Sequence, residues 1–99
     1  MIIYIDIDET ICSTKGLDYS GAKPIIKNIK RANKLYNSGH TIVYWTGRGR
    51  ETGIDWREMT ENQFKLWGVR YNKLLFNKPY DIIIDDKAIN TKDWKDLEL

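Results

Sequence analysis

The chain has 99 residues, 41% hydrophobic and 30% charged, which is enough for one folded domain over residues 1–99 and too little for two. Its formal net charge of +2 is too small to favour binding to nucleic acid or to a membrane surface. Its single cysteine excludes an internal disulfide, and no apolar run is long enough to cross a bilayer, so we expect a cytoplasmic protein.

The first part of the chain predicts a strand, a loop and a helix. Residues 2–7 are nearly all apolar, which is typical of a strand covered on both faces. Residues 13–21 are polar and include two glycines, which predicts a loop. Pro24 stands where proline often opens a helix, and apolar residues at helical spacing follow it until the Asn-Ser-Gly stop at residues 37–39.

The second part predicts three more strands and a second helix. Residues 40–45 form a strand pattern, and Asp55 is a candidate N-cap for a helix that stops at Gly68. Residues 73–76 and 81–84 are short strand patterns. This order predicts an α/β fold of Rossmann type, with a mainly parallel sheet, helices on both faces and no separate cap domain.

Polar side chains follow three of the four predicted strands, and a lysine lies in the turn before the fourth. Ligands bind beyond the carboxyl ends of the strands in such sheets, so we expect these side chains to converge. The lysine precedes its strand, so it needs a loop that folds over the same edge. The residues are Asp6, Asp8, Thr46, Lys78, Asp85 and Asp86.

These residue types favour phosphoryl transfer. Carboxylates gathered at one point repel each other unless a cation lies between them, and oxygen ligands without histidine or paired cysteine favour Mg²⁺. Threonine and lysine donate well to phosphate, and an aspartate can attack phosphorus. A second aspartate two residues later lies on the same side of a strand, where it could transfer protons. Each residue alone is explained by a turn or a cap, and only their joint order points to chemistry.

Four motifs carry a resemblance to a known family. They are DIDET at residues 6–10, TIVYWTGR at residues 41–48, Lys78 in NKPYD, and IIIDD at residues 82–86. Together they resemble the haloacid dehalogenase (HAD) superfamily of phosphohydrolases. The resemblance implies a single HAD-like catalytic domain, and the short loops of this chain leave no room for a cap.

The resemblance assigns the chemical roles residue by residue. It implies that Asp6 is the nucleophile and a Mg²⁺ ligand. Asp8 would be the general acid and base, with its backbone carbonyl as a further ligand. Thr46 would bind the transferring phosphoryl group, and Lys78 would neutralise charge on that group and on Asp6.

The same resemblance extends to the rest of the site. Asp85 would bind Mg²⁺ directly. Asp86 would bind Mg²⁺ through water or would orient the lysine. Gly47 and Arg48 would contact the substrate, Arg48 beyond its phosphate. Arg50 could do the same, although a surface charge explains it slightly better.

The substrate class also follows from the resemblance. Residues 46–71 and 78–88 look like those of small capless hydrolases often associated with bacterial capsule and surface-sugar biosynthesis. This implies a small phosphomonoester such as a sugar phosphate, with no nucleic acid or membrane partner. Capless members act on large substrates or use a neighbouring subunit as a lid, so a homo-oligomer is one expectation.

Three alternatives stay open. Glu9 replaces the glycine common in the family, and DxDET resembles phosphatases that act on phosphoserine in proteins. A phospho-accepting receiver domain also uses acids, a hydroxyl and a lysine, but in a different order along the chain. A non-catalytic relative is disfavoured because all the key groups are present. Cys12 could act as a nucleophile with His40, but a buried structural role suits it better.

Overall fold

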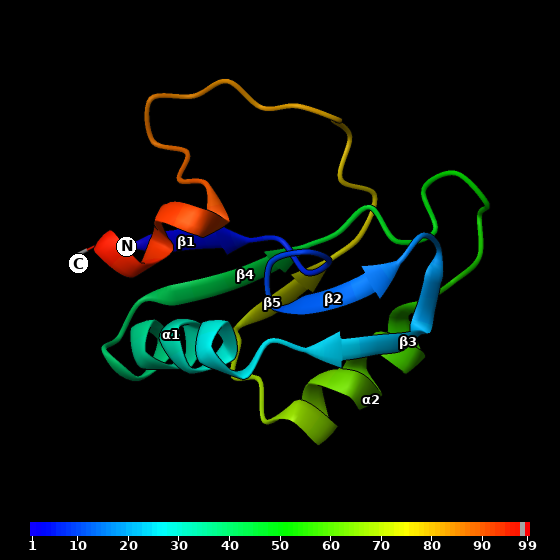
Figure 1. Cartoon of the computed structure of the whole chain (residues 1–99), viewed down its shortest axis with the longest axis horizontal. Helices are drawn as coiled ribbons and strands as arrows, with labels where there is room; N and C mark the ends of the chain where they lie inside the picture. Colours follow the sequence, from blue (N-terminus) through cyan, green and yellow to red (C-terminus); the bar gives the residue numbers. More distant parts are fainter. Residues whose placement is uncertain (98) are drawn as a thin grey trace.

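The computed structural model describes residues 1–97 and 99. These residues form an α/β fold with a parallel three-stranded sheet in the order β1-β4-β5, a separate antiparallel hairpin and no cap domain (Figure 1). The sheet strands are β1 (Ile2–Ile5), β4 (Thr41–Trp45) and β5 (Lys73–Leu75). All three were predicted, with slightly longer bounds.

The two helices cover one face of this sheet. They are α1 (Ile26–Asn37) and α2 (Arg57–Trp67), and neither has the length and apolarity needed to cross a bilayer. Ile29 of α1 and Phe64 of α2 belong to the same buried cluster as Tyr44 of β4. The expected helices on both faces are not found in the described residues. The strands follow one another across the sheet in one direction, and right-handed crossovers then place both helices on the same side.

The predicted loop at residues 13–21 was wrong, because a β-hairpin occupies it. The hairpin consists of β2 (Cys12–Lys15) and β3 (Asp18–Pro24). Gly16 lies in the tight turn between the two strands and has a φ of 56°, which glycine adopts without strain. A glycine-containing turn between strand-forming residues outweighed the polar composition.

Pro24 is the last residue of β3 and does not open α1. It pairs with Cys12 across the hairpin, and α1 begins two residues later, at Ile26. The expected end of α1 was right. The second helix also ends as expected, at Gly68, which has a left-handed φ of 71°.

The predicted strand at residues 81–84 was wrong. A parallel strand needs a crossover of about a dozen residues, and only residues 76–80 separate β5 from this segment. Residues 79–90, the outer arc, therefore leave the body of the molecule and return at the short helix η1 (Thr91–Asp96) (Figure 1). Trp94 of η1 packs back against the core cluster.

Candidate active site

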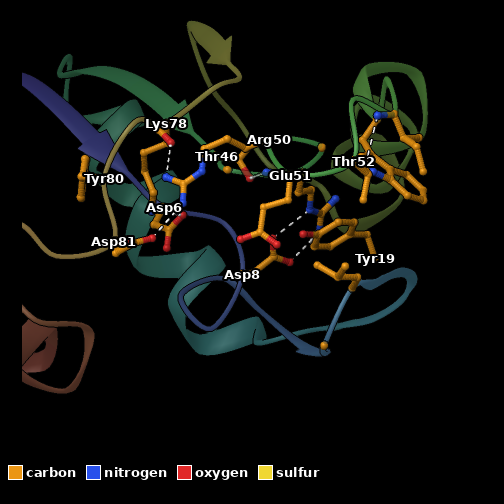
Figure 2. A pocket seen from close by; sticks show the side chains of 17 residues that line it. Asp6, Asp8, Tyr19, Thr46, Arg50, Glu51, Thr52, Lys78, Tyr80 and Asp81 are labelled. Carbon is orange, nitrogen blue, oxygen red and sulfur yellow. Dashed lines mark hydrogen bonds and ion pairs between the residues drawn. The ribbon is translucent and has the colours of Figure 1, made fainter.

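A pocket of about 490 Å³ opens beyond the carboxyl ends of β1 and β4 (Figure 2). It is walled by the turn after β1, the turn after β4, the hairpin and the segment after β5. The structure brings six of the predicted site residues to this pocket. They are Asp6, Asp8, Thr46, Gly47, Arg48 and Lys78.

A tight turn directly after β1 presents the two aspartates. The backbone N–H groups of Thr10 and Ile11 both donate to the carbonyl of Ile7, which closes the turn. Glu9 has a φ of 61°, in the left-handed region where glycine is normally favoured. Its carboxylate accepts a hydrogen bond from the backbone N–H of Thr14 at 2.8 Å. Glu9 therefore has a structural contact that ties the turn to the hairpin.

Asp6 forms an ion pair with Lys78, with 3.0 Å between Nζ and Oδ1. The lysine reaches the site because the turn after β5 folds over the sheet edge, as expected. Its backbone N–H donates to the carbonyl of Thr46, and its ammonium lies 5.2 Å from the ring centre of Tyr80. The pair joins two segments that are far apart in the sequence.

Thr46 lies at the end of β4 with its side chain oriented by the backbone. Its own N–H donates to the carbonyl of Leu75, and its hydroxyl oxygen accepts from the backbone N–H of Arg48 at 3.1 Å. Since the oxygen accepts this bond, the hydroxyl proton is available to donate into the pocket.

Arg48 lies inward, and its guanidinium contacts protein groups where a substrate contact was expected. Its side chain is fully buried, and each of its five N–H donors has an acceptor. Nε and Nη2 donate to the two carboxylate oxygens of Asp8, at 3.0 and 2.9 Å. The remaining donors bond to Thr60, Gln63 and Cys12. No donor is left over for a ligand, so Arg48 orients Asp8.

This contact also sets the charge of Asp8. Burial raises the pKa of Asp8, but hydrogen bonds from Arg48 and Thr14 outweigh burial and leave the pKa below its ordinary value. The Thr14 hydroxyl donates to Oδ1 at 2.6 Å. Asp8 is therefore a carboxylate at neutral pH.

Cys12 is buried below the pocket, as expected. Burial and the charge of Asp8 raise the pKa of Cys12 to about 11, so its thiol stays protonated. His40 does not pair with Cys12. Its Nδ1 lies 3.0 Å from the ammonium of Met1, at the opposite end of the sheet.

Asp85 and Asp86 lie on the outer arc and do not line the pocket. Asp85 caps a local turn, and the backbone N–H of Lys87, which donates to it at 2.8 Å, lowers its pKa. Within residues 1–97 and 99, no three acidic, histidine or cysteine side chains are arranged to hold a metal ion. The expected Mg²⁺ ligands are therefore not assembled within one copy of the chain.

Several pocket residues were missed from the sequence. The hairpin contributes Leu17 and Tyr19, and Trp56 stands against Tyr19 at a ring distance of 5.3 Å. A glycine turn between strand-forming residues was the signal that could have revealed the hairpin. At the rim, Arg50 donates to the carbonyl of Lys78 and pairs with the exposed Asp81 at 2.8 Å. Leu17, Tyr19 and Trp56 therefore form an apolar wall of the pocket, and the charged groups form the other wall.

Comparison with known proteins shows that the fold is shared by a solved structure. No family model and no curated protein matches the chain. A crystal structure described as an MCSG target from Vibrio cholerae is similar, with a TM-score of 0.89 and 23% sequence identity. The match covers 99% of this chain and 89% of that one. At this identity the likeness is one of fold alone.

Proposed function

We propose that this protein is a Mg²⁺-dependent phosphatase of the haloacid dehalogenase type that hydrolyses a small phosphomonoester through an aspartyl-phosphate. The observation that carries the proposal is the ion pair between Asp6 and Lys78 at 3.0 Å, in one pocket with Thr46. A carboxylate, an ammonium and a hydroxyl from three separate segments are the groups that phosphoryl transfer to an aspartate needs.

In the first step a carboxylate oxygen of Asp6 attacks phosphorus. A P–O bond forms to Asp6, and the P–O bond to the leaving group breaks. Lys78 and the Thr46 hydroxyl stabilise the charge on the phosphoryl oxygens. The leaving oxygen needs a proton, and a phosphate monoester still carries one in part near pH 6. Asp8 can relay this proton, because its oxygens are acceptors.

In the second step Asp8 acts as the base. It takes a proton from water, and the water oxygen attacks phosphorus. The bond between phosphorus and Asp6 then breaks, which releases phosphate and restores the Asp6 carboxylate, and Asp8 returns its proton to the phosphate or to solvent. The two charge-assisted bonds from Arg48 hold Asp8 in place for this step.

Asp6 and the backbone carbonyl of Asp8 are the groups in the pocket that would hold Mg²⁺. When bound, it would offset the repulsion between the phosphate and the carboxylates. One copy of the chain does not fit the full expected ligand set, because Asp85 and Asp86 lie outside the pocket.

The pocket supports a small substrate such as a sugar phosphate. A volume of about 490 Å³ lies in the range of small-molecule sites. Leu17 and Trp56 offer apolar surface to a ring-shaped leaving group. The alternative of a phosphoprotein phosphatase relied on Glu9, and the contact of Glu9 with Thr14 accounts for that residue structurally.

The test is phosphate release from a panel of phosphomonoesters, with Mg²⁺ and with EDTA. Turnover of small phosphates that needs Mg²⁺ and falls by about 10³-fold or more in Asp6→Asn would support the proposal. Asp93→Asn is the matched control, because Asp93 is an exposed aspartate of η1 that does not line the pocket. If wild type and Asp6→Asn release phosphate equally, or neither does, the proposal fails.

A further inference from the structure

One edge of the sheet has no partner in the described residues. β1 pairs with β4 on one side only. None of the other backbone hydrogen bonds of residues 1–97 and 99 involves residues 2–5. Ile2 and Tyr4 on this strand are 71% and 55% exposed. The strand has no proline, lysine or bulge of the kind that protects natural edges, so it can accept another strand.

The outer arc holds an exposed segment whose composition favours a β-strand. Residues 81–84 read Asp-Ile-Ile-Ile, a composition that favours β-strands. Ile82, Ile83 and Ile84 are 81%, 51% and 96% exposed. Figure 1 shows this part of the chain arching away from the sheet. A strand-forming apolar run and an unpaired strand edge are thus both exposed on the same molecule.

The segment is too tightly tethered to pair in parallel with β1 of its own chain. The backbone of Lys78 is bonded to Thr46 at the carboxyl end of the sheet. A parallel strand has to start at the amino end, about 13 Å away along the four residues of β1. Residues 79–81 span at most about 10 Å when fully extended. A parallel partner for this edge therefore has to come from another molecule.

We propose that residues 81–84 of one copy add as a parallel strand to the unpaired edge of β1 in a second copy. Each copy gives its segment to the other, so the contact is symmetric and closes as a dimer. Main-chain hydrogen bonds supply the attachment, and the isoleucines leave water.

The exposed surface area of the chain is larger than expected for a monomer, as a dimer contact requires. The structure exposes 6897 Å². A folded monomer of 11.7 kDa is expected to expose about 5,900 Å², so the excess is about 1,000 Å². A standard protein interface buries about 800 Å² on each partner. The excess is of the size that one dimer contact would cover.

The added strand also bears on the active site, and this part rests on the proposed function. If Ile84 of the partner subunit lies level with Ile5, then Asp85 of the partner subunit lies next to Asp6. The acids that one copy fails to assemble would then come from two copies. We infer that the pocket is completed between subunits.

The first test is the oligomeric state, measured by sedimentation equilibrium. Wild type is expected to be a dimer. Ile82→Asp should weaken the dimer by at least about 100-fold, because it places a charge in the paired strand. Leu66→Asp is the matched control, since Leu66 of α2 is also 81% exposed, and it should leave the dimer intact. A monomeric wild type, or a dimer unaffected by Ile82→Asp, overturns the proposal.

An engineered disulfide tests which segment pairs with the free edge of β1. In the proposed register Ile83 faces Tyr4, so the double variant Tyr4→Cys, Ile83→Cys should form a bond between chains under oxidation. Native Cys12 is buried and does not compete. A bond within a single chain would show that the segment closes on its own β1 and would contradict the exchange.

A mixing experiment tests the shared site. Asp6→Asn and Asp85→Asn are each expected to be inactive, and their mixed dimer contains one intact site. Random mixing after dissociation should restore about a quarter of the wild-type activity. A mixed dimer without activity would overturn the shared site. A wild-type dimer inactive on every phosphomonoester would instead overturn the proposed function, and the interface would stand.

Discussion

The two sides of the pocket are built in opposite ways. On one side, the buried guanidinium of Arg48 has an acceptor for every donor, and all of them come from the same chain. The outer arc starts at the opposite rim with Tyr80 and Asp81, and beyond the rim it exposes Ile82 and Ile84 by 81% and 96%. The difference separates the part of the site that one copy completes alone from the part that we propose a second copy completes.

A buried charge is tolerated only when its partners are already in place. The chain meets this need at Arg48 with residues from the turn after β1 and from α2. The arc carries its charges in water, where they cost little, and its apolar residues are the groups left without partners. Predictions on the two sides should therefore differ in kind and in size.

The largest expected effect comes from Arg48→Met. The substitution leaves Asp8 without its cation, so the free energy of unfolding should fall by about 3 kcal/mol or more. Arg50→Met is the matched control, because Arg50 pairs with an exposed aspartate, and it should cost less than about 1 kcal/mol. Urea unfolding at a fixed protein concentration measures both. Equal losses would remove the distinction between the two sides.

Thr60→Val tests the inner contacts of the same arginine. The fully buried hydroxyl accepts from Nη1 of Arg48, which keeps Gln63 as its other acceptor. We expect a loss of about 1 kcal/mol in the same unfolding experiment. Thr52→Val, at an exposed position on the pocket rim, is the control and should change little. No difference between the two variants would mean that the buried bond contributes nothing.

Lys78→Met should act on binding more than on stability. The pair with Asp6 is part-exposed, so its loss should cost less than about 1 kcal/mol of unfolding free energy. Inhibition by inorganic phosphate should weaken by about 10-fold or more, because the ammonium no longer faces the anion. Arg57→Met removes a surface charge outside the pocket and should leave inhibition unchanged. A destabilised variant with unchanged phosphate inhibition would contradict this role.

The smallest effect concerns the reactivity of Cys12. Its pKa of about 11 means that little thiolate forms at pH 8, and burial blocks reagents. Alkylation by iodoacetamide should be slow in the native protein and should keep rising with pH up to about pH 11 rather than level off near pH 9. The unfolded protein, as the control, should react rapidly. Fast labelling of the native protein at pH 7 would contradict a protonated, buried thiol.

Local patterns predicted the sheet strands and the ends of both helices, because apolar periodicity and glycine stops act over a few residues. The convergence of Asp6, Thr46 and Lys78 also followed, since parallel strands end at one edge. The role of Arg48 could not be predicted, because its acceptors lie 12 to 40 residues away in the chain. The prediction of a strand at residues 81–84 was wrong because it relied on the strand-like composition alone. The connection before this segment is too short for a parallel strand.

The most direct test of the proposed function is to trap the covalent intermediate. The enzyme is quenched in acid during turnover of its best small phosphomonoester and mapped by peptide mass spectrometry. We expect the phosphoryl group on Asp6, and no such adduct in Asp6→Asn. Turnover without an adduct on Asp6, or with the phosphoryl group on another residue, would contradict the proposed function.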